Sequence, residues 1–374
     1  MPKKVLIDVN SMLCRSGMTH LSGIGRTTFD LLRALQDIDD LPLDIQLFTR
    51  TLRGRLPMER FSFRHVNLPL PAGKLIDLLL NASSFLDRLL PHDLLHIPHN
   101  YAAAANPEKT VVTMHDAMFF SYPEDFLGHE YARSHYPQLA RDAKAVITCS
   151  RSSKEDIVTF MRIPPEKITV VHWGVNRETF YPSEKGIALA VLEKRGLVGR
   201  PFFVFVSCDV GRKNTITVMR AFRRALQANI DHDLLLVWGS PPDEYLREFS
   251  SDIAAGRIRF VAHVDDEVLR LLYTASTVSW FPSRYEGFGL PLLESMACGT
   301  PVVTCRNSSL QEVGGGAALY VGPDDADGMT ELMIAFDRGW SGYDELAERS
   351  ITRAAEFRWD ETARKYVDFY MQQM

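Results

Sequence analysis

Two carboxylates with glycines between them are the residues of this chain best suited to hold a polar ligand. Glu286 and Glu294 lie in the stretch RYEGFGLPLLESMACGTPVV, which begins at Arg284. A carboxylate can accept hydrogen bonds from two vicinal hydroxyl groups, so each acid suits a sugar or a ribose. Gly287 and Gly289 would let a phosphate approach the backbone N–H groups between the two acids. The same acids could instead serve only as caps of a helix.

Proline and glycine predict the local elements that position these acids. The apolar run TVSWFPS before the stretch indicates a buried strand. Glycine and proline discourage a helix at first, whereas proline is tolerated in a first helical turn. We therefore expect a helix that starts at Leu290 or Pro291 and is terminated by Gly299. Glu286 then lies on the loop after the strand, and Glu294 lies near the start of the helix.

Two adjacent cations, Arg212 and Lys213, follow another apolar run, PFFVFVSCD. A departing diphosphate must be stabilised by fixed cations or by a metal. Arginine can bind phosphate bidentately and lysine acts as a point charge, although such a pair is also common on a solvated surface. No D-x-D pair stands beside a strand end in the second half of the sequence. We therefore predict a site that needs no metal and no other cofactor.

The first half of the chain offers a histidine at a comparable position. His115 follows the apolar run KTVVT, which predicts a strand. It is either a structural residue at a strand end or a group that donates a hydrogen bond to a ligand or accepts one from it. Further upstream, the loop SGIGR precedes a stretch in which Phe29, Leu32 and Leu35 have helical spacing.

Strand-like and helix-like segments alternate along the chain in two successive series. Such alternation implies mostly parallel sheets covered by helices, and 374 residues are too many for one ordinary core. We therefore predict an α/β protein with two Rossmann-like domains, at residues 1–180 and 181–353. Residues 354–374 are expected to form a helix that crosses back to the first domain. The stretch 181–201, with a proline and several charges, is interpreted as a hinge region.

The composition limits the partners and the compartment. A net charge of -5 gives no overall field that attracts nucleic acid, so we exclude it as a partner. Neither a signal-peptide core nor an apolar run long enough to cross a membrane is present in the sequence. The cysteines show no C-x-x-C pairing, which indicates free thiols and a cytoplasmic protein. They are Cys14, Cys149, Cys208, Cys298 and Cys305.

Several motifs together resemble the retaining glycosyltransferases of family 4, which have the two-domain GT-B fold with sheets that face each other across a cleft. The resemblance is carried by the stretch around the two glutamates and by SGIGR, TMHD, ITCSRSSKEDI, VHWGVN, GRKN, GGGAALYVGPDD and FRWDETARKYVDFY. It extends over nearly the whole chain. It implies transfer of a hexose from a nucleotide diphosphate sugar with retention of anomeric configuration.

The resemblance also implies roles for residues of the second domain. Glu286 would hold the hydroxyl groups of the donor hexose, Glu294 the ribose, and Arg212 with Lys213 the diphosphate. The backbone of four consecutive residues would line the sugar and the phosphate: Gly287, Phe288, Gly289 and Leu290. One departure is Ser207, which stands where many members of the family have an arginine.

In the first domain the resemblance assigns His115 to the hexose in the reaction centre, and Gly23 and Gly25 to the approach of backbone toward the diphosphate. Retaining hydrolases use two carboxylates, whereas only Glu286 is expected near the sugar here. We therefore favour a front-face displacement, in which the acceptor hydroxyl attacks as the diphosphate leaves. A covalent intermediate on Glu286 is the alternative.

The acceptor is the least defined partner. We expect a saccharide or a lipid-linked acceptor in the assembly of a surface polysaccharide, with GDP-mannose as the donor. The basic stretch around Arg53 and Arg55 and the apolar stretch 74–90 could contact the inner membrane surface, although an ordinary core helix explains the second stretch equally well. Two other functions stay open, a nucleotide-sugar epimerase of the same fold and a non-catalytic sugar-binding protein.

Overall fold

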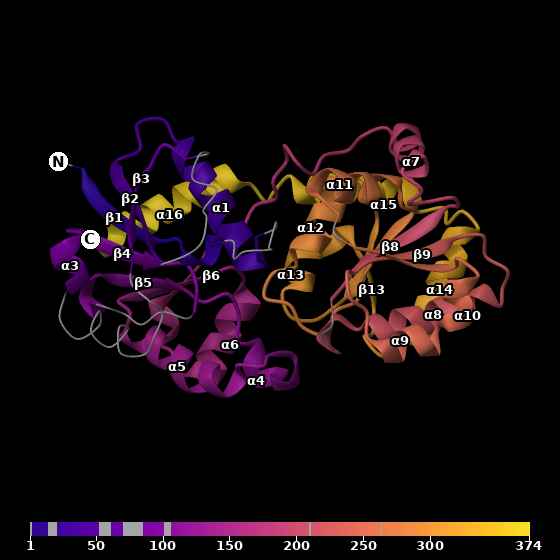
Figure 1. Cartoon of the computed structure of the whole chain (residues 1–374), viewed down its shortest axis with the longest axis horizontal. Coiled ribbons are helices and arrows are strands. Elements are labelled where there is room, and N and C mark those ends of the chain that lie inside the picture. Colours follow the sequence, from indigo (N-terminus) through magenta and orange to yellow (C-terminus); the bar gives the residue numbers. More distant parts are fainter. Residues whose placement is uncertain are drawn as a thin grey trace. The chain divides into compact units, whose positions relative to one another are not determined.

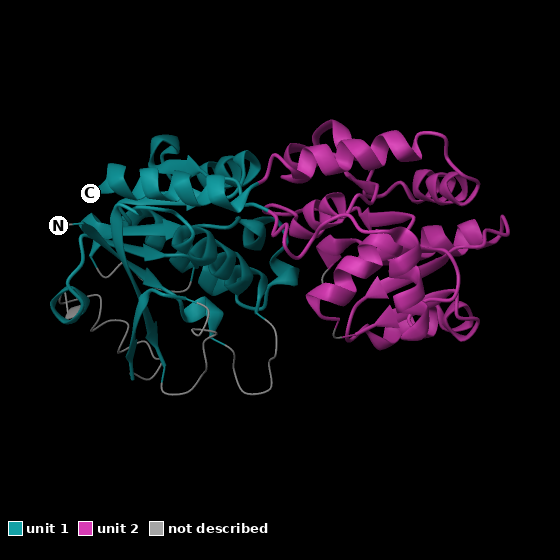
Figure 2. Ribbon diagram, turned by 90° about the horizontal axis from the view of Figure 1, so that it is seen from above, with its two compact units in different colours: residues 1–174, 358–374 teal, residues 175–357 magenta. Residues whose placement is uncertain are grey.

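A computed structural model of the chain describes residues 2–13, 21–51, 61–69, 85–100, 106–208, 211–262 and 264–374. The chain divides into two compact units (Figure 2). Unit 1 comprises Met1–Gly174 and Arg358–Met374, and unit 2 comprises Val175–Phe357. The sequence prediction had placed these two divisions after residues 180 and 353. The basic stretch around Arg53 and most of the apolar stretch 74–90 lie outside the described residues.

Unit 1 is built on a parallel sheet with the strand order β3-β2-β1-β4-β5-β6-β7 (Figure 1). The described strands are β1 (Lys3–Asp8), β2 (Leu43–Arg50), β3 (Arg64–Leu68), β4 (Leu94–Ile97), β5 (Thr110–Thr113), β6 (Ala145–Thr148) and β7 (Ile168–Val170). Five strands after β1 coincide with apolar runs of the sequence, as expected for strands buried on both faces: LDIQLFT, DLLHIPH, KTVVT, KAVITCS and KITVVHWGV. Strand β3 was not predicted, because its residues are mostly polar and only partly buried.

Helices cover both faces of this sheet. The described helices of unit 1 are α1 (Gly23–Gln36), α3 (Phe85–Leu89), α4 (Met118–Ser121), α5 (His129–Asp142), α6 (Arg151–Met161) and α16 (Trp359–Gln373), with short 3₁₀ turns at Asn10–Met12, Pro107–Lys109, Pro123–Asp125 and Pro165–Lys167. Val5 and Ile7 of β1 pack in the core beneath α1 and α16, whereas Leu6 packs in the core of the other face. This alternation follows from the two-residue period of a strand.

A buried chain of hydrogen bonds joins the C-terminal helix α16 to the sheet of unit 1. The hydroxyl of Tyr370 lies 2.7 Å from Nδ1 of His96, and Nε2 of His96 lies 2.9 Å from the hydroxyl of Thr113. Burial lowers the pKa of His96 to about 3, so the ring is neutral and can donate from one nitrogen and accept at the other. The helix is therefore held by specific polar contacts as well as by its apolar face.

Unit 2 contains a second parallel sheet, with the strand order β10-β9-β8-β11-β12-β13. Its described strands are β8 (Phe202–Val206), β9 (Asp233–Val237), β10 (Ile258–Val261), β11 (Val278–Phe281), β12 (Val302–Cys305) and β13 (Leu319–Val321). Its described helices are α7 (Lys185–Lys194), α8 (Thr215–Leu226), α9 (Asp243–Glu248), α10 (Ser250–Ala254), α11 (Asp266–Ala275), α12 (Leu290–Ala297), α13 (Leu310–Gly314), α14 (Ala326–Asp337) and α15 (Tyr343–Ala354). Short 3₁₀ turns lie at Gly211–Lys213 and Gly315–Ala317.

The predicted hinge region 181–201 is part of unit 2 instead. Its residues form helix α7, in which Ala188 and Leu192 are buried. Helix α7 packs against α11, so this stretch belongs to the core of the unit. The prediction was wrong because proline and charged residues occur at the start and on the exposed side of a packed helix as readily as in a linker.

Each sheet reverses its strand order once, and these points determine where a ligand can bind. In unit 2 the strands that pair with β8 are β9 on one side and β11 on the other. The loops after β8 and β11 therefore run in opposite directions, which is where open α/β sheets bind ligands, at the carboxyl ends of the strands. The corresponding point of unit 1 lies between β1 and β4. Across the described residues, no helix is long and apolar enough to cross a membrane.

Candidate functional site

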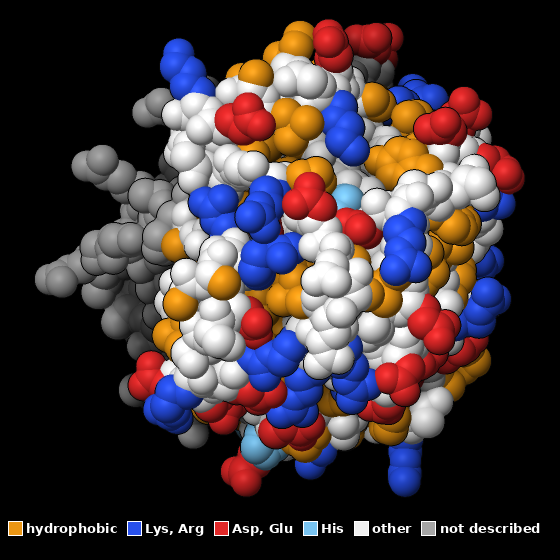
Figure 3. All heavy atoms as spheres, turned by 90° about the vertical axis from the view of Figure 1, so that its right-hand side faces the viewer, with side chains coloured by type: hydrophobic (Ala, Val, Ile, Leu, Met, Phe, Trp, Pro, Cys, Tyr) orange, Lys and Arg blue, Asp and Glu red, His pale blue; other side chains and the backbone are white. Residues whose placement is uncertain are grey.

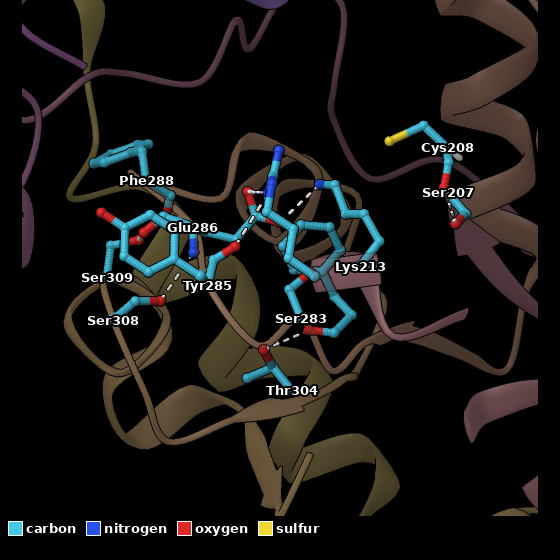
Figure 4. A network of polar contacts seen from close by, with 12 residues as sticks. Ser207, Cys208, Lys213, Ser283, Tyr285, Glu286, Phe288, Thr304, Ser308 and Ser309 are labelled. Carbon is cyan, nitrogen blue, oxygen red and sulfur yellow. Dashed lines mark hydrogen bonds and ion pairs between the residues drawn. The ribbon is translucent and has the colours of Figure 1, made fainter. Parts of the chain in front are cut away.

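The loops that follow β8 and β11 bring together three of the predicted site residues of unit 2. Arg212 and Lys213 lie on a 3₁₀ turn after β8, and Glu286 lies on the loop after β11. The Nζ atom of Lys213 is 2.7 Å from Oε1 of Glu286, and a guanidinium nitrogen of Arg212 is 3.2 Å from Oε2. Figure 4 shows Lys213 and Glu286 with the polar residues around them. We call Arg212, Lys213 and Glu286 the charged cluster.

The charged cluster is nearly enclosed by protein. The side chains of Arg212, Lys213 and Glu286 expose only 17%, 12% and 10% of their surfaces. Burial by itself would raise the pKa of Glu286, but Lys213 and then Arg212 outweigh it and lower this pKa below its usual value. The Nζ atom of Lys213 also lies 4.6 Å from the centre of the Phe281 ring. The cluster thus holds one carboxylate and two cations, with a surplus of positive charge.

The loop of Glu286 is fixed by two serines that sequence reasoning missed. The N–H of Glu286 donates to the hydroxyl of Ser308 over 3.0 Å. The hydroxyl of Ser309 lies 2.9 Å from each of two carbonyl oxygens, those of Glu286 and Phe288, and donates to them. No pattern around these serines marks them, because they follow β12, a different strand from the one that carries Glu286.

Asn214 joins the two loops and was also missed. Its backbone adopts the left-handed conformation, with φ 63°. Its side-chain amide donates to the carbonyl oxygens of Pro282, at 3.1 Å, and Pro323, at 2.6 Å. In addition, the N–H of Arg284 donates to the carbonyl oxygen of Arg212 over 2.7 Å. The cations and the carboxylate are therefore held in fixed relation by the backbone.

Helix α12 forms as predicted, from Leu290 to Ala297, after the glycines. Gly289 has φ +99°, a conformation that side chains rarely adopt, and a Cβ atom there would lie 3.0 Å from Leu310. Gly299, with φ +79°, follows the end of the helix. The N–H groups of the first turn, at Leu290 and beyond, give this end of the helix its positive character.

Two further predicted residues of this stretch, Phe288 and Glu294, are buried in different surroundings. Phe288 is 2% exposed and packs edge-to-face on Phe357, at 5.9 Å, so its side chain belongs to the core and only its backbone can face a ligand. Glu294 is 6% exposed on α12. The pKa of Cys298, one turn further along, is raised by burial and then by the charge of Glu294.

Ser207, where the family often has an arginine, comes directly after β8. Its hydroxyl hydrogen-bonds to the hydroxyl of Thr215, the first residue of α8. In unit 2 the described cations of the β8 loop are therefore Arg212 and Lys213. Among the residues that the structure describes, no group of three or more His, Cys, Asp or Glu side chains is arranged to hold a metal ion.

In unit 1, the structure fixes the hydrogen-bonding state of His115. The ring is buried, and burial lowers its pKa to about 4, so it is neutral near pH 7. Its Nε2 atom lies 3.1 Å from the carbonyl oxygen of Pro98. A carbonyl oxygen only accepts, so Nε2 carries the proton and Nδ1 carries the lone pair. The sequence left both possibilities open, and the structure leaves Nδ1 as an acceptor.

The Nδ1 atom of His115 is a buried polar atom without a hydrogen-bond partner among the described residues, and the indole N–H of Trp359 is another. Both residues line a small cavity of about 10 Å³, together with Trp173, whose ring centre is 5.3 Å from that of His115. This volume suffices for one water molecule or one hydroxyl group. An acceptor and a donor thus border a space of the size of one oxygen atom.

The two glycines of SGIGR differ in their surroundings. Both lie in the first turn of α1, where the hydroxyl of Ser22 accepts a hydrogen bond from the N–H of Gly25 over 3.1 Å. A Cβ atom on Gly25 would lie 2.5 Å from the carbonyl oxygen of Ser11, whereas one on Gly23 would meet nothing within 4 Å. Gly25 is therefore needed for packing, and Gly23 is not.

A buried contact between an aspartate and a histidine that sequence reasoning missed lies where the strand order of unit 1 reverses. An oxygen of Asp8, the last residue of β1, is 3.3 Å from Nε2 of His99, which follows β4. Burial would raise the pKa of Asp8, but His99 outweighs it and lowers this pKa. The N–H and the side-chain amide of Asn10 also donate to Asp8, at 2.8 and 2.6 Å. This pair joins the loops after β1 and β4.

Comparison with family models identifies two domains in the chain. Residues 21–179 match the model described as glycosyltransferase family 4, and residues 200–336 match the model described as glycosyl transferases group 1. Each match lies mainly within one of the two structural units.

Several curated proteins are similar in sequence. The O-antigen chain mannosyltransferase B of Escherichia coli is 27% identical over 286 residues, 74% of this chain and 74% of that protein. The MMP alpha-(1->4)-mannosyltransferase of Mycolicibacterium hassiacum is 30% identical over 62% of this chain and 55% of its own length. The O-antigen chain mannosyltransferase RfbU of Salmonella typhimurium is 29% identical over 57% of each chain.

Solved structures share the fold. Sucrose-phosphate synthase from Thermosynechococcus elongatus has a TM-score of 0.75 at 20% identity, with 99% of this chain and 98% of that chain covered. Anabaena HepE in complex with UDP and glucose has a TM-score of 0.76 at 17% identity, over 98% of this chain and 99% of that chain. The two parallel-sheet units therefore have the GT-B fold predicted from the sequence.

Proposed function

The chain belongs to the glycosyltransferases with a family 4 domain and a group 1 domain, and from this premise we propose that it transfers a hexose with retention of configuration and without a metal ion. The donor is a nucleotide diphosphate sugar, and the acceptor is a saccharide or a lipid-linked saccharide of a surface polysaccharide. Mannose from GDP-mannose is the hexose we propose, because O-antigen chain mannosyltransferases are among the similar proteins. We also propose that the protein attaches to the inner surface of the membrane.

The observation that carries the proposal is the charged cluster at the reversal of strand order in unit 2. A diphosphate requires fixed cations, and Arg212 and Lys213 supply two within bonding distance of the same carboxylate. Glu286 is ionised and therefore acts only as an acceptor, which suits the hydroxyl groups of a hexose. The N–H groups at the start of α12 add an anion site without a metal.

The state of Glu286 supports a front-face displacement over a covalent intermediate. Its two oxygens are engaged by Lys213 and Arg212, and their charges lower the nucleophilicity of the carboxylate along with its pKa. In the step we propose, the acceptor oxygen bonds to the anomeric carbon as the bond from that carbon to the diphosphate oxygen breaks. The hydroxyl proton passes to the departing phosphate, whose added charge Arg212 and Lys213 stabilise.

His115 contributes to binding of the donor hexose through the lone pair of its Nδ1 atom. Because Nε2–H is used by Pro98, the Nδ1 lone pair is the group that can accept a hydrogen bond from a hydroxyl of the hexose. Glu294 is proposed to hold the ribose, and the backbone at Gly23, Gly287 and Gly289 to approach the donor.

Binding measurements test the donor site. We would titrate UDP, GDP, ADP and their hexose conjugates by calorimetry, with EDTA present, into the wild type, Glu286→Gln and Glu294→Ala. Glu331→Gln is the matched control, since Glu331 is an exposed acid of α14 in the same unit. We expect one base to bind selectively, the conjugate to weaken in Glu286→Gln, the nucleotide itself to weaken in Glu294→Ala, and the control to match the wild type.

The outcomes also separate the alternative functions. Conversion of the donor sugar into an epimer without any acceptor would identify an epimerase, and tight binding without turnover would identify a binding protein. Failure of every nucleotide to bind would contradict the donor site. Loss of turnover in EDTA, restored by a divalent cation, would contradict metal independence.

A further inference from the structure

Unit 2 contains a second cavity, of about 500 Å³, at the edge of the sheet opposite to the charged cluster. Its lining includes Pro201, His232 and Thr277, each of which lies just before a strand, β8, β9 or β11. The charged cluster follows the other ends of β8 and β11. A volume of this size is typical of small-molecule sites, and neither family membership nor the charged cluster accounts for it.

The floor of this cavity is a closed polar network. The Nδ1 atom of His232 lies 2.7 Å from an oxygen of Asp337, and its Nε2 atom lies 2.8 Å from the hydroxyl of Thr277. The same oxygen of Asp337 accepts the N–H of Asp231 over 2.8 Å. His232 is therefore satisfied and structural, and it stacks on Phe203 with 4.6 Å between ring centres.

The rim, in contrast, presents groups available to a ligand. Arg200 and Glu193 are exposed, and neither side chain has a hydrogen bond or an ion pair within the part of the chain that the structure describes. Lys185, in contrast, is engaged: its Nζ atom lies 5.5 Å from the centre of the Tyr343 ring and donates to the carbonyl oxygen of Ser276 over 3.4 Å. Trp340 and Tyr343 are half-buried and supply aromatic surface to the lining. Figure 3 views the molecule from the side on which α7 and α14 lie in Figure 1, and there acidic and basic side chains intermingle around apolar ones.

The lining carries charges of both signs, and these disfavour an anionic or a cationic ligand. Glu193 and Asp337 oppose an anion, whereas Lys185 and Arg200 oppose a cation. An apolar ligand would cover these charged groups without replacing their hydrogen bonds to water. A neutral molecule with many hydroxyl groups can donate to Glu193 and accept from Arg200, and the C–H face of a sugar ring can pack on an aromatic ring.

We propose that this cavity binds a neutral saccharide, and we call it the second saccharide site. The inference rests on the proposed function only for the origin of the sugar, which would be a segment of the glycan that the enzyme extends. Because the second saccharide site lies at the opposite edge of the sheet from the charged cluster, it holds the glycan without reacting with it.

The test is a titration of the full chain with α-linked mannotriose, followed by saturation-transfer NMR and tryptophan fluorescence. We expect saturable binding that weakens by about tenfold in Arg200→Ala and in Glu193→Ala, since each change removes hydrogen bonds from a charged group. Both residues are exposed, so neither variant should impair folding. Arg247→Ala, an exposed arginine of α9 that does not line the cavity, is the matched control and should bind as the wild type does.

Three results would overturn the inference: no saturable binding of mannotriose, binding unchanged in both variants, or displacement of mannotriose by inorganic phosphate, which would make the cavity an anion site. A parallel nucleotide titration separates this inference from the proposed function. Arg200→Ala should leave nucleotide binding intact. If the wild type binds mannotriose but no nucleotide, the proposed function is refuted and the second saccharide site is supported.

Discussion

Burial leaves the candidate residue of one unit charged and that of the other unit neutral. In unit 2, Glu286 stays ionised in a nearly enclosed position because Lys213 and Arg212 compensate its charge. In unit 1, His115 is equally buried but neutral, because burial itself disfavours the charged ring. One unit therefore offers fixed charges, and the other offers a fixed lone pair.

This difference corresponds to two kinds of chemistry. Fixed charges stabilise a leaving group whose negative charge grows during the reaction. A neutral acceptor orients a hydroxyl group without attracting the diphosphate. Burial therefore keeps a residue charged where a compensating partner lies within bonding distance and neutral where none does.

The largest effect is expected on the unit 2 side of the comparison. Replacing Glu286 by Gln removes the ionised acceptor and leaves Lys213 and Arg212 without their counter-charge. We expect kcat for hexose transfer to fall by about 10³-fold, the order seen when one group that stabilises a transition state is removed. Steady-state kinetics of purified protein measure this, with Glu331→Gln as the control. A fall of less than tenfold would refute a direct role of Glu286.

The next effect tests the neutral state of His115 through the pH dependence of stability. The folded pKa of about 4 is depressed below the unfolded value of 6.5, so the unfolded chain binds more protons between these values. The stabilisation is complete above pH 6.5 and is lost as the pH falls toward 4. The loss amounts to about 3 kcal/mol at most.

Urea unfolding of the full chain at pH 7, 5.5 and 4.5 measures this loss. The variant His115→Gln should lose less stability than the wild type over the same interval, because glutamine does not titrate. His135→Gln is the control, since His135 is an exposed residue of α5 in the same unit. Parallel curves for the wild type and His115→Gln would show that His115 is not kept neutral by the fold.

Much of this arrangement was predictable from local patterns. Glycines and a proline predicted the start of α12, and apolar runs predicted most strands and hence placed Arg212, Lys213 and Glu286 on loops after strands. These signals are local, because backbone preferences and burial act within a few residues. Local signals therefore suffice to place each of these residues at the correct end of the sheet.

What could not be predicted depends on which strands are neighbours. The adjacency of β8 and β11, separated by two intervening strands in the sequence, creates the ion pairs of Glu286 and the bond from Asn214 to Pro282. The bond from His115 to Pro98 likewise joins loops of neighbouring strands β4 and β5. No local pattern encodes such pairs. The sequence therefore predicts a hexose contact for Glu286 and a diphosphate contact for the two cations, but not the ion pairs between them.

A third prediction separates packing from ligand contact among the glycines of unit 1. Gly25→Ala should destabilise the protein by about 2 kcal/mol, because the new methyl group would overlap the carbonyl oxygen of Ser11 and force the backbone to move. Gly23→Ala is the control, since the space around it is open. Thermal unfolding measures both. Equal stability of the two variants would show that the first turn of α1 adjusts without cost.

The smallest effect is expected at Ser309, which tests whether the charged cluster depends on its supporting loop. Ser309→Ala leaves the carbonyl oxygens of Glu286 and Phe288 without this donor, so the free energy of unfolding should fall by about 1 kcal/mol. Because the loop then holds Glu286 less firmly, KM for the donor should rise several-fold while the pH profile of transfer stays unchanged. Ser309→Thr keeps the hydroxyl and should recover most of the loss. If Ser309→Ala lowers stability but leaves KM unchanged, the loop position of Glu286 is set by Ser308 and the backbone alone.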